Sequence, residues 1–492
     1  MTTLVPELLW RDGRFEAGLA VVLDPETGQI RALIPATDVS DDALHLPARA
    51  LLPGFVNAHS HAFQRLLRGR TQWRPADQPH ADFWSWRQAM YAAAGALEPA
   101  EVEAVARFCF VEMLRAGWTA VGEFHYLHMQ PNGAPYADPN ELALRVLAAA
   151  RSAGIRIRLL NVCYATGGIG APLAPEQRRF AAPTREAFLE RTAGLLAVVG
   201  QDAGGREGGG QEGGGPEPGA QGTGARGIGG QGLATVGVAA HSVRAVPRAW
   251  LGELAAWARA RAVPLHVHAA EQPAEVAACL EAYGVRPVAL LDAEGALGGD
   301  TTVVHATHLD QAEIQALAAS GATVCACPTT ERDLGDGILP AAELLAAGVP
   351  LALGTDSQSV IDPFDEMRSL EYHERLRSRR RVVLARADHD RLAAAPALLE
   401  AASAGGARAL GLHAGKIEPG ALADLVSVEL EHRALAGWSP DTLAPLLALS
   451  GPLDAVRDVW VGGVHRVVDG VHPLEAEAQA AFRDVACRRG GA

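Results

Sequence analysis

Lysine is almost absent from this sequence: of the 43 basic residues other than histidine, only Lys416 is a lysine and the rest are arginines. No lysine therefore lies in the middle of the chain. This excludes a phosphate loop of the Walker type, a Schiff-base lysine, and a lysine-derived carbamate that bridges two metal ions.

Cysteine and long apolar segments are also scarce. The six cysteines are scattered, which is typical of buried thiols and not of a disulfide framework. No apolar run reaches the roughly 18 residues that a membrane-spanning helix needs. The first residues, MTTLVPELLWRDGRFEAG, lack a basic segment followed by an apolar one, so we expect no signal peptide and a cytoplasmic protein.

Positive charge is in deficit as well. Acidic residues outnumber basic ones by 57 to 43, a net charge of −14, which argues against nucleic acid or an anionic membrane as a partner. Hydrophobic residues make up 49% of the chain, enough for a large buried core. We expect a homodimer that acts on a small molecule.

Eight short apolar runs recur along the chain, each with a polar tip and most followed by a helical pattern. They span 51–61, 118–128, 155–164, 234–244, 264–272, 301–308, 322–331 and 350–359. Apolar strands that alternate with amphipathic helices indicate a parallel sheet covered by helices. A doubly wound sheet is the alternative, but eight near-equal units favour an α/β fold of the closed (β/α)₈ TIM-barrel type.

Strand-like character also marks both ends of the chain. We therefore predict a barrel over 53–414 and a small β-sandwich domain built from 1–52 and 415–475, with a tail over 476–492. Residues 203–232 contain 15 glycines among 30 residues. This composition cannot bury enough surface to offset its ordering entropy, so we predict a flexible insert without a catalytic role.

Histidines gather where the predicted strands end. His59 and His61 lie two apart on the first strand, so both imidazoles face the barrel axis. The fifth strand carries His266 and His268, and Glu271 follows three residues later. Neutral imidazoles at this spacing suit a divalent metal ion.

The later strands extend this pattern. The sixth ends in His305, with His308 just beyond it, and the eighth ends in Asp356 within the string GTDS. Active sites of β/α barrels lie at this carboxyl end of the strands. The set therefore predicts a metal-dependent active site.

These residues and their surroundings resemble the amidohydrolase superfamily of metal-dependent barrel hydrolases. Within it, several strings are similar to the formimidoylglutamate deiminase family: NAHSHAFQRLLRGRTQ, DFWSWRQAMY, GEFHYLH, HVHAAEQPAEV, VVHATH, TERDLGDGILPAAELLAAG and GTDSQSVIDPFDEMRSLEYHERLR. The resemblance covers about residues 50–380, and it implies hydrolysis of a carbon–nitrogen bond in a linear amidine. Departures are the glycine-rich insert and the lead-in CPTTERDLGDG, which we expect to affect at most the pocket rim.

The resemblance also implies roles for the individual residues. It implies one divalent metal ion per chain, usually zinc, with four ligands: His59, His61, His268 and Asp356. The absence of a mid-chain lysine agrees with the single-metal branch of deaminases. His305 would lie beside the metal-bound water and Asp356 would accept its proton, while Glu271 would protonate the leaving nitrogen, contributing roughly 10²–10⁴-fold. His266 is expected to be structural or to support the ligands, and His308 is unassigned.

A dicarboxylate substrate needs donors in an otherwise acidic protein. Arg244, after the fourth strand, can bind a carboxylate in a bidentate manner, and Arg87 in WSWRQ is a second candidate. Gln64, Tyr126 and His241 match family positions that contact substrate.

Two other classes of function remain open. One is a related deaminase that acts on an aromatic ring, such as guanine, cytosine or an S-adenosyl nucleoside; the arginines at strand ends argue against it. The other is a non-catalytic binding protein on a decayed barrel, which we expect to have lost ligands. The cytidine-deaminase signature P-C-x-x-C is absent, since the chain has Cys325-Ala326-Cys327-Pro328.

Overall fold

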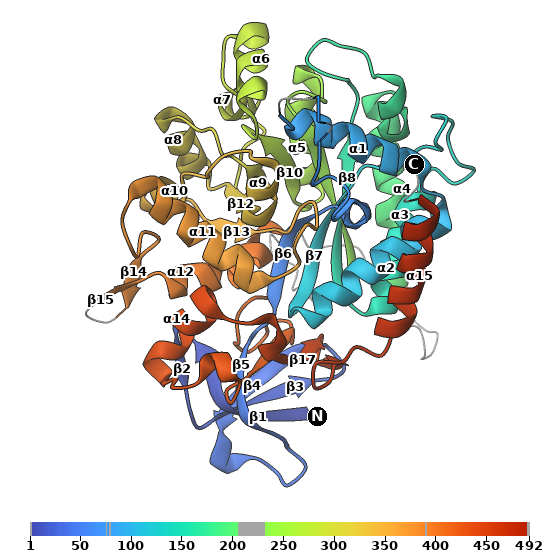
Figure 1. Ribbon diagram of the computed structural model, residues 1–492. Helices are drawn as coiled ribbons and strands as arrows, with labels where there is room; N and C mark the ends of the chain where they lie inside the picture. The colour runs from blue at the N-terminus through green and yellow to red at the C-terminus, as the bar shows by residue number, and fades with distance from the viewer. Residues whose placement is uncertain (1, 75, 78–79, 205–231, 389–390, 490–492) are drawn as a thin grey trace, which may run out of the picture.

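The computed structural model describes residues 2–74, 76–77, 80–204, 232–388 and 391–489 (Figure 1). The insert predicted over 203–232 lies outside these residues except at its ends. Among the described residues, none of the helices has the length and apolar character needed to cross a bilayer.

Eight parallel strands form the central sheet, and each lies beside the next one along the chain. They are β6 (Phe55–Ser60), β7 (Trp118–His125), β8 (Arg156–Cys163), β9 (Ala234–Ser242), β10 (Leu265–Ala269), β11 (Thr301–His305), β12 (Thr323–Ala326) and β13 (Leu351–Leu353). Just beyond β13, the first and last strands meet: the His61 backbone N–H donates to the Asp356 carbonyl at 3.0 Å, and the Asp356 N–H donates to the His59 carbonyl at 3.0 Å. The predicted barrel is confirmed.

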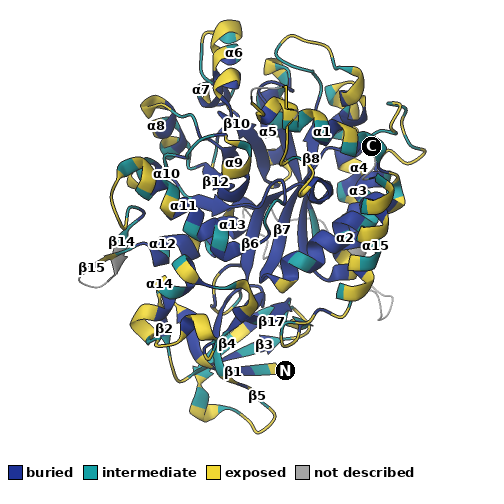
Figure 2. Cartoon of the chain, in the orientation of Figure 1, coloured by how far each residue is buried: buried dark blue, intermediate teal, exposed yellow. Residues whose placement is uncertain are grey.

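The strands are apolar because both of their faces are covered. All residues of β7 and β8 are buried, and the exposed positions lie on the outer helices (Figure 2). A glycine lets the sheet close: a Cβ at Gly354 would lie 2.8 Å from the Cβ of His59, closer than side chains tolerate. The last strand therefore packs directly against the first at the carboxyl end of the barrel.

Helices surround the barrel, and several begin with a side-chain cap. Asp82 caps the helix α1, where its carboxylate accepts the Ser85 N–H at 2.9 Å. The helices are α1 (Phe83–Ala96), α2 (Pro99–Arg115), α3 (Glu141–Ala153), α4 (Arg185–Gly204), α5 (Arg248–Ala260), α6 (Pro273–Tyr283), α7 (Pro287–Ala293), α8 (Gln311–Ser320), α9 (Pro328–Leu334), α10 (Ala341–Ala346), α11 (Pro363–Ser378), α12 (Ala395–Glu400), α13 (Gly406–Ala409), α14 (Pro440–Ser450) and α15 (Glu475–Arg489).

Strands from both ends of the chain form a second sheet, at the bottom of Figure 1. Its order is β18-β17-β16-β5-β1-β3-β4, with β2 paired to β1, and β5 runs parallel to β1 but antiparallel to β16. The strands are β1 (Thr2–Arg11), β2 (Arg14–Glu16), β3 (Leu19–Asp24), β4 (Gln29–Pro35), β5 (Leu44–Pro53), β16 (Leu425–Glu429), β17 (Val456–Val461) and β18 (Val464–Val467). The prediction of a β-domain made from both chain ends is confirmed. A short hairpin, β14 (Arg386–Asp388) and β15 (Arg391–Ala393), lies apart from both sheets.

The segment assigned to a C-terminal tail contains the helix α15, which packs on α2. The ring of Phe482 stacks on that of Phe108 with centroids 4.4 Å apart. Arg489 Nη2 donates to Glu101 Oε2 at 2.7 Å. This helix therefore covers an outer helix of the barrel.

Candidate active site

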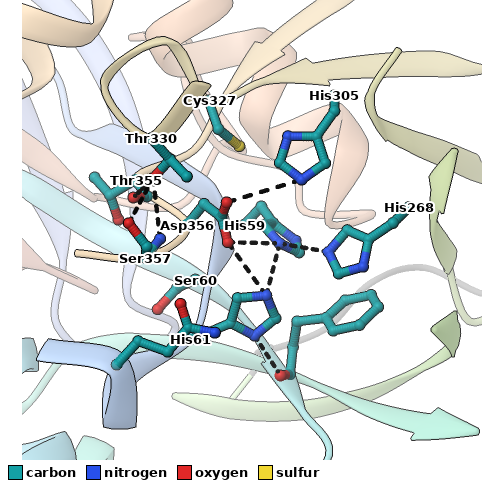
Figure 3. Close-up of polar contacts among 12 residues, drawn as sticks. His59, Ser60, His61, His268, His305, Cys327, Thr330, Thr355, Asp356 and Ser357 are labelled. Atoms are coloured by element: carbon teal, nitrogen blue, oxygen red, sulfur yellow. Dashed lines mark hydrogen bonds and ion pairs between the residues drawn. The ribbon is translucent and has the colours of Figure 1, made fainter. Parts of the chain in front are cut away.

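Four side chains from three regions of the barrel converge at its carboxyl end (Figure 3). The Nε2 atom of His59 lies 3.1 Å from that of His61 and 3.0 Å from that of His268. Asp356 Oδ1 lies 3.2 Å from His61 Nε2 and 3.5 Å from His59 Nε2. We call these four residues the primary cluster. Each of them was predicted from the sequence as a metal ligand.

The donor set of the primary cluster fits a divalent metal ion. His61 Nδ1 lies 3.0 Å from the carbonyl oxygen of Phe124 and donates to it, so its Nε2 carries a lone pair directed at the other ligands. Burial lowers the pKa of His61 to about 3, and burial and neighbouring histidines hold the pKa values of His59 and His268 well below their usual range. Neutral imidazoles around one carboxylate are the ligands that zinc takes in proteins.

The backbone is strained where two of these strands end. His305 has φ of 71° and Asp356 has φ of 47°, the left-handed region that non-glycine residues rarely adopt. Such conformations cost on the order of 1–3 kcal/mol and are concentrated at functional sites. Here these backbone conformations direct the side chains of His305 and Asp356 toward the three ligand histidines.

His305 lies among three carboxylates. Its Nε2 is 3.8 Å from Glu271 Oε1 and 3.8 Å from Asp356 Oδ2, and its Nδ1 is 3.5 Å from Glu331 Oε1. Burial opposes protonation of this ring, but the carboxylates outweigh burial, with Glu271 the largest, and raise the pKa of His305 well above its usual range. The imidazole is thus able to take up and hold a proton beside the metal ligands.

Glu271 links this group to an arginine. Arg244 Nη2 donates to Glu271 Oε2 at 2.9 Å, and Arg244 Nε lies 3.6 Å from Glu275 Oε2. Arg244 is 8% exposed; among the described residues its Nη1 has no hydrogen-bond partner, and its Nε has only the ion-pair contact with Glu275. A buried guanidinium with unused donors is able to bind a further anion.

One cavity contains nearly all of the predicted site residues. Its walls include the ligands His61, His268 and Asp356, together with Glu271 and His305. The five predicted substrate contacts also line it: Gln64, Arg87, Tyr126, His241 and Arg244. His59 lies behind this wall and is fully buried.

Hydrogen bonds fix several of these lining side chains. Gln64 Nε2 donates to the hydroxyl of Tyr126 at 2.9 Å, and Arg87 Nη2 donates to the hydroxyl of Tyr164 at 2.9 Å. Burial and the two arginines lower the pKa of His241 well below its usual range, so this ring is neutral. The cavity thus joins the primary cluster to a wall with two arginines.

Two further histidines point elsewhere. His266 Nε2 donates to the carbonyl of Ala409 at 2.8 Å, and His308 Nε2 donates to the carbonyl of Asp336 at 2.7 Å. Neither lines the cavity. His266 tethers the barrel strand to α13, which agrees with the structural role predicted for it.

Sequence reasoning missed several buried acids near the site, among them Glu331 and Glu123. Glu331, in α9, faces His305. Glu123 accepts hydrogen bonds from Ser60 Oγ at 2.5 Å and from the Ala62 N–H at 2.8 Å, and burial raises its pKa to about 8. An acidic residue within an apolar strand was the available signal for Glu123, and the signal for Glu331 was its place at the polar end of the run 322–331.

The sequence is similar to those of known enzymes. The pattern of the amidohydrolase family matches residues 50–466. The chain is 38% identical to formimidoylglutamate deiminase of Pseudomonas aeruginosa, covering 98% of this chain and 97% of the relative. It is 32% identical to 5-methylthioadenosine/S-adenosylhomocysteine deaminase of Natronomonas pharaonis, covering 96% and 93%.

Solved structures are similar over the whole chain. An amidohydrolase from Brucella melitensis superposes with a TM-score of 0.85 at 34% identity, covering 99% of this chain and 100% of the other. An adenosine deaminase from Xanthomonas campestris with bound zinc superposes with a TM-score of 0.79 at 26% identity, covering 100% and 99%.

Proposed function

The chain belongs to the amidohydrolase family, and on this premise we propose that it hydrolyses N-formimino-L-glutamate to N-formyl-L-glutamate and ammonia, a step of histidine degradation. Water adds to the formimino carbon, the carbon–nitrogen bond to the terminal nitrogen breaks, and that nitrogen leaves as ammonia. The atoms of one water molecule are divided between the two products.

One observation carries this proposal: a single cavity is lined both by ligands of the primary cluster and by a buried arginine, part of whose hydrogen-bonding capacity is unused. Arg244 uses Nη2 for Glu271, and among the described residues its Nη1 has no hydrogen-bond partner. Arg87 lines the same cavity. A substrate with a formimino group and two carboxylates is complementary in charge to such a cavity.

The primary cluster would hold the metal ion, for which we propose zinc at one ion per chain. When bound, the ion lowers the pKa of a coordinated water molecule and so supplies a nucleophile at neutral pH. The adenosine deaminase from Xanthomonas campestris, whose solved structure has bound zinc, supports this choice of metal.

The protein's own groups would move the protons. Asp356 accepts a proton from the attacking water, and His305 stabilises the charge that develops beside it. Glu271 delivers a proton to the imino nitrogen through Oε1, since its Oε2 is engaged by Arg244. Arg244 therefore both orients Glu271 and offers donors to a substrate carboxylate.

A ring deaminase is the second candidate, because a relative at 32% identity is a 5-methylthioadenosine/S-adenosylhomocysteine deaminase. Phe83, Trp86 and Tyr126 in the cavity wall would offer stacking surfaces to a ring. A neutral ring, however, would leave the free donors of Arg244 desolvated without a partner, which costs free energy. A non-catalytic role is disfavoured, because all four ligands of the primary cluster are present.

A substrate panel tests the proposal. Metal-loaded protein is incubated with N-formimino-L-glutamate, 5-methylthioadenosine, guanine and cytosine, ammonia release is measured, and the products are identified by mass spectrometry. We expect release from N-formimino-L-glutamate with N-formyl-L-glutamate as product. Faster release from any of the ring substrates would overturn the assignment.

The homodimer and the cytoplasmic location stay predictions.

A further inference from the structure

A second group of ligand-type side chains lies next to the primary cluster. His305, Cys327 and Glu331 each offer one ligand atom, and these three atoms lie within 4.8 Å of one another. The three side chains are between 0 and 2% exposed. We call them the secondary cluster. In Figure 3 the sulfur of Cys327 points toward the space between Asp356 and His305.

The position of the secondary cluster follows from the chain. β11 ends at His305, Cys327 is the N-cap residue of α9, and Glu331 lies in the first turn of that helix. Glu331 Oε1 accepts the backbone N–H of Cys327 at 2.8 Å, which holds this carboxylate against the other two groups. His305 Nδ1 is buried; among the described residues it makes the 3.5 Å contact with Glu331 Oε1 but no closer hydrogen bond.

This donor set suits a thiophilic or borderline divalent ion. A thiolate, an imidazole and a carboxylate are all ligands of zinc, and sulfur favours zinc or cadmium over magnesium or calcium. Each ligand atom would need to move by less than about 1 Å to reach bond lengths of about 2.0–2.3 Å. The primary cluster contains no sulfur, so the two clusters differ in the chemistry by which they bind metal.

We propose that the secondary cluster is a binding site for a second divalent ion, zinc or cadmium, which fills when metal is in excess and stops turnover. Binding replaces the thiol proton of Cys327, which is released to solvent, by a metal–sulfur bond. A cation on Nδ1 would fix the His305 ring, whose Nε2 lies 3.8 Å from Asp356 Oδ2, and would place a second positive charge beside the primary cluster. The inhibition rests on the proposed function, but the binding does not.

Cadmium binding tests the site without reference to activity. Protein with one equivalent of zinc is titrated with Cd²⁺, and the ultraviolet charge-transfer absorption of a cadmium–thiolate bond is recorded. We expect one equivalent of this absorption, with activity falling in parallel. Cadmium that displaces zinc from the primary cluster adds no such band, because no sulfur is present there.

Variants assign the band to a residue. Cys327→Ser should lose it and should raise the cadmium concentration for half-inhibition at least about tenfold. Glu331→Gln leaves the thiol in place and should raise by about tenfold or more the cadmium concentrations needed for the absorption band and for inhibition. It serves as the second variant if Cys327→Ser does not fold. Cys487→Ser, which removes the exposed cysteine, is the matched control and should behave as the native protein.

The outcomes separate the two claims. Native protein without the band, or a band that persists in Cys327→Ser, overturns the second site. A band that depends on Cys327 in a protein that releases no ammonia from N-formimino-L-glutamate supports the site and overturns the proposed function instead.

Discussion

Glu271 lies between the arginine wall of the cavity and His305, which is next to the metal ligands. One oxygen is held by Arg244 at 2.9 Å and the other faces His305 at 3.8 Å. The arginine thereby fixes the carboxylate in a position where the second oxygen is open to the cavity. A group placed in this way is suited to carry a proton, which is the role proposed for Glu271.

Replacing Glu271 with glutamine should therefore separate metal binding from proton transfer. The amide keeps the size of the side chain but cannot carry the proton, so kcat should fall by about 10²–10⁴-fold while metal content stays at the native value. Steady-state kinetics and elemental analysis measure the two quantities. Retention of more than about a tenth of the native kcat contradicts the role given to Glu271.

Arg244 should recognise a substrate carboxylate. Arg244→Met should raise KM and lower kcat/KM for N-formimino-L-glutamate by about 2–4 orders of magnitude, from the roughly 2–5 kcal/mol lost when one partner of a buried charge pair is truncated. Arg244→Lys should also be damaging, because an ammonium group cannot hold Glu271 and a carboxylate in the same fork geometry.

Arg244 also holds Glu271, so the Arg244 variants could lose kcat/KM in two ways: by losing the contact with a substrate carboxylate or by displacing Glu271. A comparison of substrates separates the two. Both variants are compared on N-formimino-L-glutamate and on formimino compounds that lack one carboxylate, with metal content measured in parallel. Equal losses on all of these compounds would mean that Arg244 acts only through Glu271.

At the scale of elements, the barrel strands could be predicted because their signal is local. Each is a short apolar run with a polar tip, and parallel strands buried on both faces require that composition. The same locality made part of the primary cluster predictable, since His59 and His61 are two apart on one strand. The full ligand set, with His268 and Asp356, followed from the resemblance to the amidohydrolase superfamily. The ion pair of Arg244 with Glu271 could not be predicted, because it depends on how β9 and β10 are aligned.

Other elements were missed because their signal is tertiary. The helices α14 and α15 lie in regions assigned to strands or to a tail, and α15 has a weakly apolar sequence that is stabilised by packing on α2. Helix stability in proteins depends mainly on such packing and less on propensity. The contact of Glu331 with His305 was missed for the same reason: only the fold brings α9 against β11.

The strand β17 depends on a buried carboxylate that links it to its neighbours. Asp458 accepts hydrogen bonds from Ser427 Oγ at 2.8 Å, His465 Nε2 at 3.1 Å and the Asp469 N–H at 3.2 Å. Burial alone would raise the pKa of Asp458, but these bonds outweigh burial and lower it. Its stabilising effect is therefore present above the unfolded-state pKa near 4 and is lost as the pH falls through the folded-state pKa.

Asp458→Asn should accordingly lower the unfolding free energy by about 1–3 kcal/mol at pH 7, and the difference from native protein should shrink below about pH 4. Urea unfolding at both pH values measures this. Asp454→Asn is the control, since this exposed carboxylate pairs with His432 on the surface and should contribute little. If the difference in unfolding free energy between Asp458→Asn and native protein grows as the pH falls, the carboxylate does not stabilise the fold in its charged form, and the account of Asp458 is wrong.

At the scale of the whole molecule, both sheets depend on contacts between distant parts of the chain. The barrel closes where Asp356 meets the strand that carries His59, and the second sheet joins β5 to β16. The sequence predicts the number of barrel units and the β-character of both ends. It does not predict how the arginines and acids in the cavity pair, because those contacts form only once all eight units have packed.

The central claim is that this cavity hydrolyses a formimino group on a dicarboxylate. The most direct test is the ratio of kcat/KM in the native protein between N-formimino-L-glutamate and the same molecule without its α-carboxylate. Loss of one buried charge-assisted contact of roughly 2–5 kcal/mol predicts a ratio of at least about 30 in favour of the dicarboxylate, with N-formyl-L-glutamate as its product. A ratio near one, or no ammonia from either compound, would contradict it.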